Sequence, residues 1–83
     1  MPYITNDRRI AIDIDGEQPK TAGELNYKLT LLLIEYWEAQ DPSYQRINDV
    51  VGACEGAKAE FQRRVAVPYE DAKIQANGDV YVY

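Results

Sequence analysis

The fold class predicted by the sequence is all-α: a small helical hairpin of two long antiparallel helices, 21–40 and 44–67, with short flanking helices and an extended C-terminal tail. Two long stretches carry apolar residues at helical spacing, and each follows a residue suited to cap a helix. A chain of 83 residues forms one domain. We divide it into an arm over 1–20, the hairpin over 21–67, and a short helix, turn and tail over 68–83.

The arm is predicted to contain one short helix. Thr5 or Asn6 can cap a helix that continues through Ile12. Ile10, Ile12 and Ile14 also alternate with other residues, which leaves a short strand as the competing interpretation. We prefer the helix, followed by a loop over 15–20.

The first long helix begins with a capping box. Thr21 can accept a hydrogen bond from the amide of Glu24, and the Glu24 side chain can reach back towards the start of the helix. Its apolar residues fall on two faces: Leu25, Leu29, Leu32, Leu33 and Tyr36 on one, and Leu31, Ile34 and Trp37 on the other. Because two helices of one chain would leave a face exposed, another copy of the chain is the simplest cover.

The second long helix follows a break at 40–43, where Pro42 cannot continue a helix and Ser43 can cap the next. One stripe of this helix contains Ile47, Val50, Val51, Cys54, Ala57, Phe61 and Val65. Gly52 and Gly56 lie one turn apart, and each costs about 1 kcal/mol relative to alanine. The close approach of another helix or of a ligand would offset that cost.

The C-terminal segment is predicted to begin with a helix break at Pro68, because a proline disfavours helical geometry in the residue before it. A short helix then covers 69–76, and Asn77-Gly78 ends it. The last residues, 79–83, alternate like a short edge strand or an extended docking tail.

Composition argues against several functions. The formal charge of −5 disfavours binding to long nucleic acids, and the longest apolar run, 31–34, is too short to cross a membrane. No histidine is present, so Cys54, which we expect in the core, lacks a catalytic partner. A metal site built from Glu55, Glu60, Glu70 and Asp71 alone is disfavoured. We therefore predict no enzyme, no cofactor and no metal, and a cytoplasmic homodimer or higher homo-oligomer.

Three motifs cover most of the chain: MPYI at the start, GELNYKLT over 23–30, and INDVVGACEGAKAEFQRRVAVPYEDAKIQANGDVYVY over 47–83. Through these motifs the chain resembles a widespread family of short, uncharacterised proteins of phages and prokaryotes. It is also similar in size and helical type to phage proteins that act as sponges for the cyclic nucleotide signals of bacterial anti-phage defence, such as CBASS. That similarity implies immune evasion in a host cytoplasm by binding and sequestering a cyclic di- or trinucleotide.

The predicted ligand-binding residues are Asn26, Tyr27, Arg63, Arg64, Tyr69, Glu70, Lys73, Asn77, Gly78 and Asp79. An arginine can hold a phosphate in fork geometry, and a tyrosine can stack on a base. The structural alternatives are ion pairs of the arginines with Glu60 or Asp71, a packed Tyr69, and a simple turn at 77–79. The alternative function is a protein–protein interaction module that inhibits or scaffolds a host protein.

Overall fold

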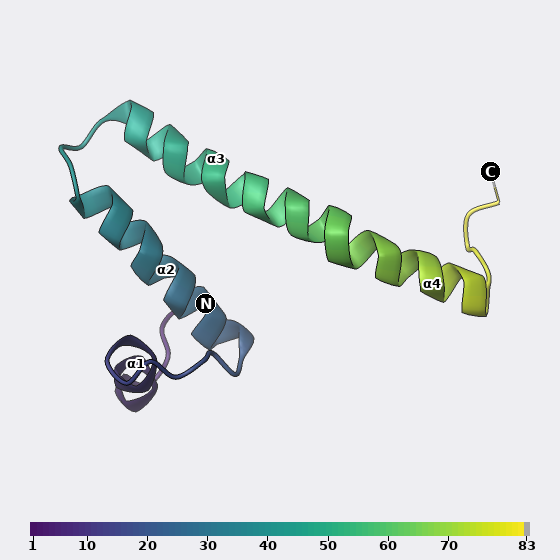
Figure 1. The fold of residues 1–83 in the computed structure, drawn as a ribbon, viewed down its shortest axis with the longest axis horizontal. Coiled ribbons are helices and arrows are strands. Elements are labelled where there is room, and N and C mark those ends of the chain that lie inside the picture. The colour runs from purple at the N-terminus through teal and green to yellow at the C-terminus, as the bar shows by residue number, and fades with distance from the viewer. Residues whose placement is uncertain (83) are drawn as a thin grey trace. The chain divides into compact units, whose positions relative to one another are not determined.

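A computed structural model describes residues 1–82, and all of its regular secondary structure is helical (Figure 1). The elements in chain order are α1 (Asn6–Asp13), α2 (Ala22–Glu38), α3 (Tyr44–Phe61), the π-helix η1 (Gln62–Ala66) and α4 (Val67–Asn77). No strand occurs among the described residues, so the all-α prediction is confirmed. The chain divides into two compact units, Met1–Val50 and Val51–Tyr83, which we describe separately.

The predicted helix caps are present. The side-chain oxygens of Thr5, Thr21 and Ser43 each accept a hydrogen bond from the amide three residues further on, at 3.4, 3.1 and 3.1 Å respectively. These bonds satisfy amides that have no partner inside the helix. They fix the starts of α1, α2 and α3 close to where the sequence places them.

In the first unit, α1 packs against α2, so the segment predicted as an arm is docked through its helix. Ala11 and Ile12 are the buried apolar residues of α1. At the start of α2, Gly23 leaves room for the N-terminal residues. A Cβ added there would meet the backbone oxygen of Met1 at 3.2 Å and the Ile4 side chain at 3.4 Å.

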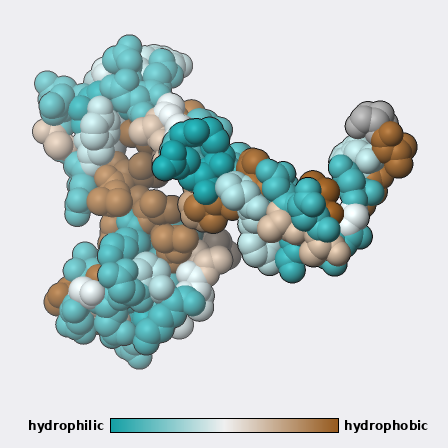
Figure 2. Space-filling view, turned by 45° about the vertical axis from the view of Figure 1, so that its right-hand side comes forward, coloured by the Kyte–Doolittle hydropathy of each residue, from teal (hydrophilic) through white to brown (hydrophobic). Residues whose placement is uncertain are grey.

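The apolar residues of α2 differ in exposure, but not along the two predicted faces. Leu31, Leu33 and Trp37 are half-buried, whereas Leu25, Leu29, Leu32, Ile34 and Tyr36 are 44–56% exposed. We call four of the exposed residues, Leu25, Leu29, Leu32 and Tyr36, the α2 seam. Figure 2 shows apolar atoms gathered over the middle of the first unit, between polar ends. This surface agrees with the expectation that one chain leaves an apolar face of this helix uncovered.

In the second unit, the helix break predicted at Pro68 is wrong. Helical structure continues without a gap from α3 through η1 into α4, and Pro68 lies in the first turn of α4. The amide of Val67 donates to the carbonyl of Gln62, five residues earlier. An ordinary α-helix would bring the proline ring against the carbonyl of Arg64. A wider turn before the proline relieves that clash and lets the helix continue.

The helix ends where the sequence predicts. Gly78 has a φ of +90°, which glycine adopts readily, and its amide donates to the carbonyl of Ile74 at 2.8 Å. Residues 79–82 form no strand, and Tyr83, the end of the predicted tail, lies outside the described residues. The break at 40–43 is also present. The antiparallel packing of the two long helices stays a prediction.

Candidate functional site

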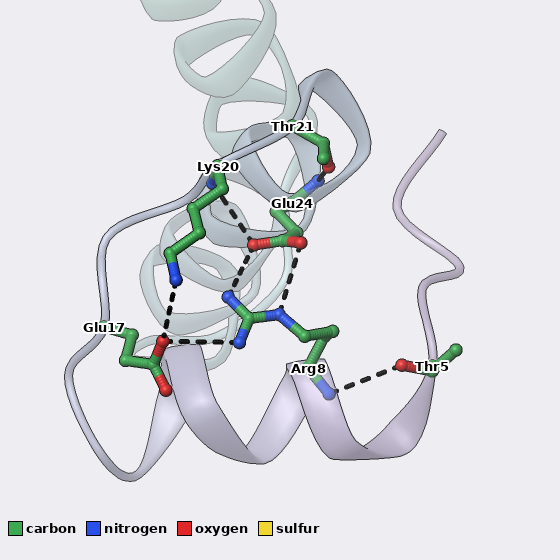
Figure 3. Close-up of polar contacts among 6 residues, drawn as sticks. All are labelled: Thr5, Arg8, Glu17, Lys20, Thr21 and Glu24. Atoms are coloured by element: carbon green, nitrogen blue, oxygen red, sulfur yellow. Dashed lines mark hydrogen bonds and ion pairs between the residues drawn. The ribbon is translucent and has the colours of Figure 1, made fainter.

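The most connected polar cluster of the first unit joins α1, the following loop and α2 (Figure 3). The Nε of Arg8 donates to Oε2 of Glu24 at 3.2 Å, and its Nη2 donates to Oε1 at 2.8 Å. Its Nη1 donates to Glu17 at 3.3 Å. The backbone amide of Lys20 donates to Glu24 at 3.2 Å, and the Lys20 ammonium lies 3.6 Å from Glu17.

The electrostatics of this cluster indicate a structural role. Hydrogen bonds from Arg8 lower the pKa of Glu24, against the opposing effect of desolvation, and the Lys20 amide lowers it further. The hydrogen bonds to Glu24 and Glu17 raise the pKa of Arg8 far above its ordinary value. A carboxylate held this firmly in its charged form is poorly suited to exchange protons with a substrate near neutral pH.

The predicted phosphate-binding pair lies in η1. Arg63 is already paired, with its Nη2 2.6 Å from Oε1 of Glu60 and its Nε 3.3 Å from Oε2. Both side chains are largely exposed, so this bond contributes little stability and leaves Arg63 able to exchange partners. Arg64 makes no hydrogen bond or ion pair with a described residue.

Five of the predicted ligand-binding residues lie together at the end of α4. They line one shallow hollow of about 330 Å³, which is bounded by Glu70, Lys73, Ile74, Asn77, Gly78, Asp79, Val80 and Tyr81. Above it along α4, the Lys73 ammonium lies 5.6 Å from the centre of the exposed Tyr69 ring. The hollow presents two carboxylates against one ammonium, a balance that favours hydrogen-bond donors over a bare phosphate.

The other two predicted residues belong to the first unit. The hydroxyl of Thr30 donates to the backbone oxygen of Asn26 at 2.8 Å and to its side-chain oxygen at 3.3 Å. The Arg9 guanidinium lies 5.8 Å from the centre of the Tyr27 ring. These contacts lie within the first unit, and a ligand-binding role for Asn26 and Tyr27 stays a prediction.

A pocket that the sequence did not predict lies at the turn between α2 and α3. This turn pocket has a volume of about 680 Å³ and is lined by Tyr36, Gln40, Asp41, Ser43, Gln45, Arg46 and Asp49. Arg46 is only 8% exposed. Its Nη1 donates to Gln40 at 2.9 Å, its Nη2 donates to the backbone oxygen of Tyr36, and its guanidinium lies 4.3 Å from the Tyr36 ring centre. We call these contacts of Arg46 with Gln40 and Tyr36 the Arg46 clamp. Its only signal in the sequence is an arginine in the first helical turn after a capping serine.

Two further features bear on chemistry. Cys54, expected in the core, is exposed in the structure. Among residues 1–82, no three histidine, cysteine, aspartate or glutamate side chains are grouped so that they could hold a metal ion. Over the same residues, no helix combines the length and apolar character needed to cross a bilayer.

The chain matches one family model, described as a domain of unknown function (DUF6899), over residues 1–80. No curated protein and no solved structure matches the chain.

Proposed function

We propose that this chain, which belongs to the DUF6899 family of domains of unknown function, is a non-enzymatic binding protein that works through helix-to-helix association, first of all with further copies of itself. One observation carries the proposal. Between residues 51 and 82 every side chain is exposed except that of Ala66, which is half-buried. Most helical stability in proteins comes from packing of an apolar face, so a helix this bare is expected to have a partner.

The exposed residues of the second unit include large apolar ones. Phe61, Val65, Val67 and Tyr69 are 49–64% exposed, and they lie within little more than two turns. Clustered apolar surface of this kind is typical of interaction sites.

The α2 seam supports association in the same way. Leu25, Leu29, Leu32 and Tyr36 are spaced by four, three and four residues, the spacing at which one helix presents a continuous edge to another. About half of each side chain is exposed, which gives an apolar strip on the order of 300–400 Å² per chain. A stable interface buries roughly 800 Å² on each partner, so the seam needs its polar flanks or the second unit to complete one.

A second copy is the partner that the charges favour. The segment 51–83 carries four basic and five acidic side chains, so two copies of it repel each other only weakly. Glu60 and Arg63, already paired within one chain, can also pair between chains. A strongly basic or strongly acidic partner would meet charges of both signs on this segment, so electrostatic attraction does not favour it over a second copy.

Light scattering coupled to size exclusion, with circular dichroism on the same samples, tests the proposal. We expect a dimer or larger assembly at micromolar concentration, and loss of both assembly and helicity in Phe61→Glu. Gln62→Glu is the matched control, because it adds the same charge one residue away and removes no apolar side chain. A monomer that stays fully helical at low micromolar concentration would overturn the proposal.

Sequestration of a small nucleotide signal is the second candidate function, and the hollow at the end of α4 favours it. Five residues predicted from the sequence line that hollow, and Arg64 has no partner among the described residues. The carboxylates would accept hydrogen bonds from base amino groups, while Lys73 and Arg64 would approach phosphates.

Calorimetric titration with cyclic di- and trinucleotides tests this second candidate. We expect binding with the nucleotide recovered unchanged, and weaker binding in Lys73→Ala and Arg64→Ala. Lys58→Ala is the control, since it removes a charge from the same unit outside the hollow. Unchanged affinity in both site variants would exclude the assigned phosphate role.

A further inference from the structure

We propose that the turn pocket is a binding site for a small phosphate ester, with Arg46 as the residue that receives the phosphate. All of its lining residues lie in the first unit. The inference does not depend on the association proposed above or on the hollow at the end of α4.

The charge of Arg46 is the first argument. The side chain is 8% exposed, and no carboxylate of a described residue lies within ion-pair distance of it. Its contacts are an amide oxygen of Gln40, the backbone oxygen of Tyr36 and the face of the Tyr36 ring. A buried charge is costly unless it is paired, and a ring face or neutral oxygens offset only part of that cost. An anion is the partner that balances it.

Unused hydrogen-bond donors are the second argument. A guanidinium has five N–H groups, and Arg46 uses two of them in these bonds. Its Nε is buried and has no partner. α3 begins at the same place, and the amides of Tyr44 and Gln45, in its first turn, have no acceptor within the helix. A helix N-terminus and an arginine at one pocket together favour a phosphate.

The two aspartates of the pocket determine what kind of phosphate fits. Asp49 accepts hydrogen bonds from the Tyr36 hydroxyl at 3.2 Å and from Gln45 at 2.8 Å, while Asp41 makes none with a described residue. These carboxylates repel a free inorganic phosphate but accept hydrogen bonds from hydroxyl or amino groups. A phosphate ester that carries such donors would satisfy both the Arg46 charge and the two aspartates, and it is therefore the class of ligand that fits. The pocket volume of about 680 Å³ lies within the range of about 300–1,000 Å³ usual for small-molecule sites.

The experiment is an NMR titration of the ¹⁵N-labelled full chain at fixed ionic strength with three probes: adenosine monophosphate, inorganic phosphate and adenosine. We expect adenosine monophosphate to shift the amides of Tyr44, Gln45 and Arg46 in a saturable way. Inorganic phosphate should bind the same amides more weakly, and adenosine should leave them unchanged. If adenosine monophosphate leaves these amides unshifted at millimolar concentration, or shifts only residues 70–79, the inference is wrong.

Two variants sharpen the test. Arg46→Lys keeps the charge but loses the planar fork, and we expect the affinity to fall on the order of tenfold. Arg9→Lys is its control, because Arg9 also lies over a tyrosine ring of this unit but outside the pocket. Asp41→Asn removes a carboxylate charge that repels phosphate, so the affinity for inorganic phosphate should rise roughly threefold to tenfold. That rise is measurable even if Arg46→Lys fails to fold, and its absence would overturn the assignment.

Discussion

Arg8 and Glu24, separated by 16 positions, form a two-point ion pair that joins α1 to α2. Glu24 is 7% exposed, and the same carboxylate also accepts the backbone amide of Lys20. One side chain therefore holds the short helix, the loop after it and the start of α2 together. Fork geometry on a carboxylate is more specific than a single contact, because both oxygens are engaged at once.

Replacing Glu24 by glutamine is expected to lower the melting temperature by several degrees. The substitution keeps the size of the side chain but leaves the Arg8 charge without its main partner, and a partly buried unpaired charge is destabilising. Differential scanning calorimetry measures the change. The matched control is Glu17→Gln, because Glu17 is more exposed and makes one longer contact with Arg8. Equal losses in the two variants would contradict the role assigned to Glu24.

The stability of the first unit should depend on acid in a predictable direction. The pKa of Glu24 is lowered in the folded chain, chiefly by its hydrogen bonds from Arg8. The unfolded chain therefore takes up a proton at higher pH than the folded chain, so the stabilisation is complete above the ordinary pKa of a glutamate. The stabilisation is lost as the pH falls through the lower pKa that Glu24 has in the folded chain. Urea unfolding between neutral and strongly acidic pH measures this loss, which should shrink in Glu24→Gln.

Alanine should be tolerated better at Gly52 than at Gly23. At Gly52 an added Cβ meets nothing within 4 Å, so Gly52→Ala should stabilise the helix by about 0.5–1 kcal/mol. At Gly23 the Cβ would meet the Met1 oxygen at 3.2 Å, so Gly23→Ala should gain less or destabilise. Chemical denaturation compares the two. If Gly52→Ala destabilises instead, another helix or a ligand approaches that surface, as the sequence analysis expects.

Pro68→Ala should convert η1 into ordinary α-helix. The proline lacks an amide hydrogen and occupies space near the preceding turn, and alanine removes both constraints. We expect the bond from Val67 to Gln62 to be replaced by a bond to the carbonyl of Arg63, with a gain of roughly 1–3 kcal/mol. Hydrogen exchange and ¹³Cα chemical shifts over 60–70 report the change. Retention of the original bond would mean that the side chains of η1, and not the proline, determine the wide turn.

The sequence predicted those parts of the fold that depend on local chemistry. Thr5, Thr21 and Ser43 cap helices because a hydroxyl needs only the amide three residues away. Gly78 ends α4 because its backbone adopts a positive φ without strain. Such signals are contained within one turn of chain, so no tertiary information is needed to find them.

The errors concern effects that extend beyond one turn. Pro68 was expected to end a helix, but the wider turn before it absorbs the clash, and proline preferences alone do not reveal that solution. The pairing of Arg8 with Glu24 depends on how α1 docks, which the local pattern does not determine. Five of the predicted ligand-binding residues do share one hollow at the end of α4. Arg46 was missed, because its contacts depend on the geometry of the turn between α2 and α3.

The π-helix has a consequence for how the length of this chain can change. A π turn is an α turn that contains one additional residue. Deleting a single residue between Gln62 and Ala66 would therefore turn α3, η1 and α4 into one uninterrupted α-helix. The side chains of α4 would keep their orientation around the helix axis relative to those at the end of α3. Pro68 would then clash with the tightened turn, so the deletion is tolerated only together with replacement of the proline. Relatives one residue shorter in this segment should therefore lack a proline at the corresponding position.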